Sequence, residues 1–65
     1  MKTKEQFVIR FNTGQYLESI TDSMLILETG FDKKLAYSDI YPEIVALNNY
    51  LNHNGYTCSI ERAGK

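Results

Sequence analysis

The sequence contains few of the residues on which very small proteins usually depend for stability. Of its 65 residues, one is a cysteine, Cys58, and one is a histidine, His53. A single cysteine excludes a disulfide within the chain, and a structural zinc site needs about four ligands, which these two residues cannot supply. A core of this size stabilises a fold by only about 3–5 kcal/mol. We therefore expect no cofactor and no metal, and tight packing or self-association in their place.

The sequence also lacks an excess of charge and any long apolar run. Seven Lys and Arg residues are offset by eight Asp and Glu residues, whereas a nucleic-acid-binding domain usually has a basic surface and a high pI. No stretch approaches the ~20 apolar residues of a membrane span. Residues 1–6 are charged and lead into only a short apolar run, unlike a signal peptide. With a lone reduced cysteine, these features predict a cytoplasmic protein that does not enter a membrane.

The first part of the chain has the alternating pattern of a β-hairpin. Residues 6–11 show the period of two that is typical of a strand. One face carries Phe7, Ile9 and Phe11, and the other carries Val8 and Arg10. The sequence NTGQ at residues 12–15 contains Asn and Gly, which supply the positive-φ positions of a tight turn. We therefore expect residues 16–20 to fold straight back as a second strand.

A third strand is predicted at residues 24–28, after a turn at residues 21–23. Leu25 and Leu27 lie on one face of this run, and Met24 and Ile26 lie on the other. A strand that is covered on only one side alternates with polar residues. The third strand is therefore either central in the sheet or covered on its second face. A loop is expected at residues 29–34.

One helix and a final strand are predicted in the remainder of the chain. The helix is expected to start at Ser38 and Asp39, whose side-chain oxygens can cap the first turn, and Pro42 is tolerated only in that turn. An apolar stripe at helical spacing consists of Ile40, Ile44, Leu47 and Leu51. Gly55 ends the helix in the left-handed conformation, and residues 56–61 alternate as the last strand.

The element order β-β-β-α-β predicts one small α+β domain over residues 1–65. It is a three-stranded meander plus a fourth strand, with one helix packed on one face of the sheet. Because crossover connections are right-handed, we expect the fourth strand to run parallel to a meander strand, most simply beside the first. The predicted core comprises Phe7, Ile9, Phe11, Leu25, Leu27, Ile44, Leu47, Leu51, Cys58 and Ile60.

The stretch NHNGYTC, residues 52–58, brings together the residue types of a thiol hydrolase. A nucleophilic cysteine needs a base within about 3 Å. By helical periodicity, however, His53 points away from the stripe that packs on the sheet, whereas Cys58 alternates with core residues. We therefore interpret Cys58 as a small core residue and His53 as a solvated one. The acidic residues and glycines also lack the spacing of any catalytic or phosphate-binding motif, so neither a catalytic site nor a small-molecule substrate is predicted.

The sheet face opposite the helix is the strongest candidate for a functional surface. Its predicted members are Val8, Arg10, Tyr16, Ile20, Met24 and Ile26. A small monomer seldom leaves an apolar patch of this kind in water. Either residues 31–37 fold over it, burying Phe31 and Leu35, or a partner covers it, most economically a second copy around a two-fold axis. Arg10 and Tyr16 could also stack on bases, but the scattered lysines make nucleic-acid binding the weaker alternative.

Two short motifs resemble small proteins encoded by bacteriophages and prophages of low-GC Gram-positive bacteria. They are Phe7-Val8-Ile9 and Gly14-Gln15-Tyr16-Leu17, which form the two sides of the predicted hairpin. The resemblance covers the outline of most of the chain, through one helix to a final strand. Proteins of this kind are often uncharacterised, and some act by binding host proteins. The resemblance implies an accessory protein of a phage or mobile element and carries over no catalytic residue.

These observations together favour a non-enzymatic protein-interaction module. We expect it to self-associate, as a homodimer, or to bind a host protein. The alternative is a nucleic-acid-associated regulator that uses the sheet face with Arg10 and Tyr16.

Overall fold

The predicted element order is confirmed by a computed structural model of the chain, which describes residues 5–21 and 26–64. Its elements are β1 (Phe7–Phe11), β2 (Tyr16–Thr21), β3 (Ile26–Gly30), the short 3₁₀-helix η1 (Lys33–Leu35), α1 (Tyr41–His53) and β4 (Cys58–Arg62). The strand bounds are within two residues of those predicted. Met24 and Leu25, where the third strand was expected to begin, lie outside the described residues.

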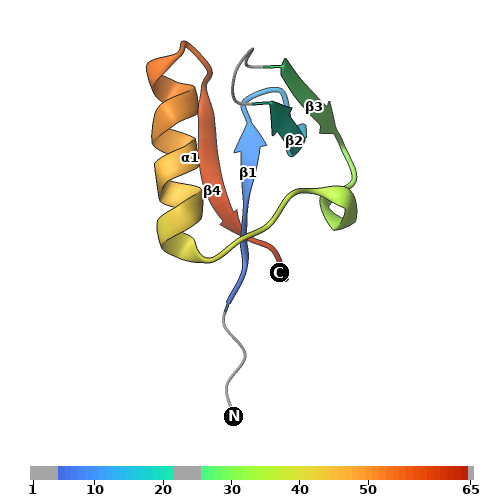
Figure 1. Cartoon of the computed structure of the whole chain (residues 1–65). Helices are drawn as coiled ribbons and strands as arrows, with labels where there is room; N and C mark the ends of the chain where they lie inside the picture. The colour runs from blue at the N-terminus through green and yellow to red at the C-terminus, as the bar shows by residue number, and fades with distance from the viewer. Residues whose placement is uncertain (1–4, 22–25, 65) are drawn as a thin grey trace.

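The four strands form one sheet in the order β3-β2-β1-β4, and α1 packs on one face of it (Figure 1). All neighbouring strands are antiparallel. β1 and β4 pair along their full length, from Phe7 opposite Arg62 to Phe11 opposite Cys58. β2 diverges from β1, and the two are in register only at Arg10 and Tyr16. The helix packs against β1 and β4, so the half of the sheet formed by β2 and β3 is left without a helix above it.

The fourth strand lies beside the first, as expected, but its predicted parallel pairing is wrong. The reason is the path of the chain before the helix. Tyr41, at the start of α1, stacks edge-on against Phe7, the first residue of β1, whereas Tyr56, just after α1, stacks against Phe11, the last residue of β1. The helix therefore runs in the same direction as β1. The tight turn at Gly55 then sends β4 back antiparallel to both.

An extended segment between η1 and α1 makes this path possible. The N–H of Tyr37 donates to the carbonyl of Leu17 on β2 (2.9 Å), and Asp39 pairs with Phe7 on β1. The helix consequently begins at Tyr41, later than predicted, with Ile40 as its N-cap. The side chain of Asp39 still contributes, because its Oδ1 accepts the Ile40 N–H at 2.8 Å. The left-handed conformation predicted for Gly55 is confirmed, with φ of +96°.

The core lies between α1 and the sheet. Its buried members on the helix side are Ile9, Phe11, Leu17, Ile44 and Leu51, with Phe7, Ile20, Leu27, Leu47, Tyr56, Cys58 and Ile60 packed around them. Every predicted core residue that the structure describes is among these. Leu17 was not predicted, and Leu25 lies outside the described residues. The sequence pattern therefore identified most of the core but missed its contribution from β2.

A bulge in β2 explains why Leu17 was not predicted in the core and why the prediction for Ile20 was wrong. The pairing of β2 with β3 shifts register between Leu17 and Ser19. An extra residue in one strand reverses the alternation of faces beyond it. Leu17 and Ile20, three positions apart, therefore both face the helix-side core, and Ile20 does not lie on the face opposite the helix as predicted.

Val8 lies on the sheet face away from the helix, as predicted, opposite Glu61 of β4. It is nevertheless buried, with an exposure of 1%. Lys33 of η1 reaches over this same face to the Glu61 carboxylate, so residues 31–37 fold over it, as one of the two alternatives expected. However, Phe31 and Leu35 are 71% and 64% exposed rather than buried.

Candidate interaction surfaces

A polar cluster centred on Glu61 occupies the sheet face opposite the helix. Oε2 of Glu61 lies 3.1 Å from Nη1 of Arg10, and Oε1 of Glu61 lies 3.4 Å from Nζ of Lys33. The Tyr16 hydroxyl donates a hydrogen bond to the same Oε1 at 3.2 Å. Both cations also approach the Tyr16 ring, at 5.9 Å and 6.0 Å from its centroid. The structure thus brings together two predicted surface residues, Arg10 and Tyr16, with two that were not predicted.

Glu61 pairs with both cations of this cluster, so one carboxylate faces two positive charges. Partial burial raises the pKa of Glu61, but hydrogen bonds from Arg10, Lys33 and Tyr16 outweigh it, so the net pKa is below the ordinary value of 4.5. Glu61 therefore stays ionised and holds both cations. A nucleic-acid phosphate would compete with this carboxylate for Arg10 and Lys33. Only the strand register, which the sequence does not reveal, could have pointed to Glu61.

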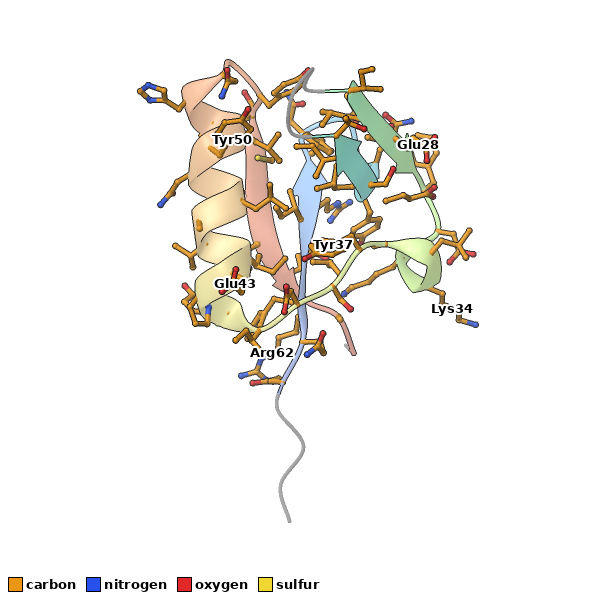
Figure 2. The ribbon with its side chains drawn as sticks, viewed as in Figure 1. Glu28, Lys34, Tyr37, Glu43, Tyr50 and Arg62 are labelled. Atoms are coloured by element: carbon orange, nitrogen blue, oxygen red, sulfur yellow. The ribbon has the colours of Figure 1, made fainter. Side chains whose placement is uncertain are left out.

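A groove of about 650 Å³ lies between α1 and β2. Its lining comprises Glu18, Ser19, Ile20, Tyr37, Glu43, Ala46, Leu47 and Tyr50. Figure 2 shows Glu43 and Tyr50 on α1, and Tyr37 on the segment that precedes it. The groove exists because α1 packs against β1 and β4 and leaves the β2 side of the same face open. Sequence alternation alone could not reveal it, since it depends on where the helix sits on the sheet.

The walls of the groove combine aromatic rings with acidic groups. The Tyr37 hydroxyl donates to Oδ2 of Asp39 at 2.8 Å. This hydrogen bond raises the pKa of Tyr37, and burial and the negative charges of Asp39 and Glu43 raise it further. Glu43 adds a second carboxylate from α1, whereas the carboxylate of Glu18 lies against Gly30 on the opposite face of the sheet. Among the described lining residues there is no Lys or Arg. The groove is therefore apolar at its base and negatively charged beside Tyr37.

A third feature is a set of exposed apolar side chains on β3 and on the segment that follows it. These two segments lie at the side of the molecule remote from α1 (Figure 1). We call this set the β3–η1 surface and define it by Ile26, Phe31 and Leu35, which are 51%, 71% and 64% exposed. It adjoins β3, which is an edge strand. Within the described residues, β3 pairs only with β2. Ile26 is the one apolar residue of the predicted surface that remains largely exposed, and Met24 lies outside the described residues.

Cys58 and His53 occupy different environments. Cys58 is a free thiol packed against the core, and burial raises its pKa, which disfavours the thiolate needed for nucleophilic attack. His53 is exposed in the last turn of α1. Within residues 5–21 and 26–64, no group of His, Cys, Asp and Glu is arranged to hold a metal ion.

The chain was compared with protein-family models, curated proteins and solved structures, and no match was found in any of the three. Among the described residues, α1 is too short and too polar to cross a membrane.

Proposed function

We propose that this protein is a non-enzymatic protein-interaction module of the cytoplasm that self-associates through the β3–η1 surface. The observation that carries the proposal is the exposure of Ile26, Phe31 and Leu35 beside an unpaired sheet edge. Large exposed apolar side chains on one side of a small protein are candidates for an association site. An unpaired edge strand presents backbone N–H and C=O groups that a second strand can bind.

A second copy is the simplest occupant of this surface. In a two-fold dimer each copy presents the same patch, so β3 of one copy can lie antiparallel to β3 of the other. The hydrogen bonds of the edge are then completed, and the exposed apolar side chains leave water. Burying each of them contributes on the order of 1–2 kcal/mol. This stabilisation supplements a core that is small by the standard of independent domains.

Sedimentation and light scattering over a range of concentrations test the proposal. The parent protein should shift from monomer to dimer as concentration rises, and Phe31→Gln and Leu35→Gln should each move that shift to higher concentration. Tyr50→Gln is the matched control, because it removes a similarly exposed apolar side chain from α1. A parent protein that stays monomeric at every concentration, or a Phe31→Gln variant that dimerises like the parent, would refute self-association.

The proposed context is a phage or mobile element, and the proposed second partner is a host protein. The support is the resemblance of Phe7-Val8-Ile9 and Gly14-Gln15-Tyr16-Leu17 to small proteins of that origin. The nucleic-acid alternative is less well supported, because Arg10 and Lys33 are both paired with Glu61 and the chain has no excess of basic residues. Generic DNA or RNA should therefore cause no salt-dependent shift in mobility.

A further inference from the structure

We infer that the groove between α1 and β2 binds a short cationic amphipathic segment of another protein. In this arrangement an apolar side chain of the segment packs on Ile20 and Leu47, and a neighbouring Lys or Arg lies beside Glu43 and Tyr37. The inference rests on the proposed function, an interaction module, but it uses a different surface from the one that self-associates.

The base of the groove suits an apolar side chain. Leu17 is fully buried beneath the sheet surface, while Ile20 and Leu47 are only partly buried and belong to the same core cluster. The bulge in β2 places Ile20 on this face. A volume of about 650 Å³ lies within the range of roughly 300–1,000 Å³ that is usual for ligand sites. Inserted side chains would thus extend the existing core rather than form a new one.

The negative charge beside Tyr37 favours a cation. Glu43 lines the groove from α1, and the Asp39 carboxylate accepts the hydroxyl of the groove residue Tyr37 at 2.8 Å. No Lys or Arg among the described lining residues offsets these two carboxylates. A Lys or Arg side chain beside Tyr37 would be attracted to both, and salt would weaken this attraction.

Two tyrosine rings in the groove also favour a cationic ligand. The faces of tyrosine rings attract ammonium and guanidinium groups, and Tyr37 and Tyr50 both line the groove. Tyr37 is held in place by its hydrogen bond to Asp39, which adds another negative charge close by.

The test measures fluorescence anisotropy of a labelled peptide of leucine and lysine in an amphipathic helical pattern. We expect saturable binding that weakens as salt is added. Ala46→Phe fills the groove from an exposed helix position and should weaken binding by about tenfold or more. Glu43→Gln should weaken it by roughly two- to fivefold. Glu5→Gln removes the same charge at a distant exposed ion pair and should leave the dissociation constant unchanged.

Three outcomes would overturn the groove assignment. One is equal weakening by Glu43→Gln and Glu5→Gln, which would indicate general attraction to an acidic protein. Another is equal binding of a leucine–glutamate peptide. The third is loss of self-association in Ala46→Phe, which would make a second copy the occupant of the groove. Phe31→Gln separates the two proposals, since it should weaken self-association and leave peptide binding intact.

Discussion

Phe7 and Asp39 exchange two backbone hydrogen bonds, with the Phe7 N–H donating to the Asp39 carbonyl at 2.8 Å and the Asp39 N–H donating to the Phe7 carbonyl at 3.1 Å. This bridge joins the start of β1 to the segment that leads into α1. It requires Asp39 to be extended, so the helix begins only at Tyr41. One long-range pairing thus fixes where the helix starts and, through it, the direction of β4.

Asp39→Ala should lower the free energy of unfolding by about 1–2 kcal/mol. The substitution keeps the backbone bridge but removes the acceptor for the Tyr37 hydroxyl and for the Ile40 N–H. Ser38→Ala is the control, because Ser38 is exposed and should change stability by less than about 0.5 kcal/mol. Urea denaturation of both variants measures the difference. A large loss for Ser38→Ala would mean that the helix starts at the earlier residue.

Asn48→Ala should stabilise the protein more than Asn49→Ala does. Oδ1 of Asn48 is buried without a hydrogen-bond partner, whereas the neighbouring Asn49 is exposed. Both substitutions raise helix propensity by a similar amount, about 0.5–0.7 kcal/mol. Only Asn48→Ala also removes an unsatisfied buried acceptor, whose presence destabilises the parent protein by about 1–3 kcal/mol. The smaller alanine side chain leaves a small void, which offsets part of this gain. Thermal unfolding of the pair isolates the cost of the acceptor, and equal gains would argue against it.

Glu61 should make stability depend on pH in the acid range. Its pKa is below 4.5 in the folded state, so its stabilising contribution is complete above the unfolded-state pKa and is lost as pH falls through the lower folded-state pKa. Glu61→Gln should lower stability at neutral pH by up to about 1 kcal/mol and flatten this acid-range loss. Arg10→Gln should reproduce part of the change, because it removes one donor to Glu61. Superimposable acid-range curves for Glu61→Gln and the parent would contradict the prediction.

The Cys58 thiol should react slowly with a disulfide reagent in the native protein. Burial raises its pKa, which lowers the thiolate fraction at neutral pH. The neutral thiol is favoured in the folded state, so its contribution to stability is complete below the unfolded-state pKa and declines as pH rises through the raised folded-state pKa. Labelling with and without urea measures the protection. Native labelling as fast as that of the unfolded chain would instead indicate an exposed, reactive cysteine.

Local sequence patterns determined the elements of this protein and most of its core. The alternation of Phe7, Ile9 and Phe11 identified β1, and the spacing of Ile44, Leu47 and Leu51 identified the buried side of α1. Gly55 marked the end of the helix, because few other residues adopt its positive φ. Because Gly55 ends the helix, His53 could be assigned to α1 and Cys58 to β4. These features depend on residues close together in the chain, so the sequence alone was sufficient to predict them.

The candidate surfaces were decided by contacts between residues far apart in the chain. The bulge in β2 moved Ile20 into the helix-side core, and η1 brought Lys33 over Val8 and Glu61. The groove depends on the placement of α1 over β1 and β4. A strand's period of two predicts which residues share a face only until a bulge intervenes, and it does not reveal which face another segment will cover. The type and order of the helices and strands were therefore determined by local sequence patterns. The surfaces available to a partner were determined by tertiary packing.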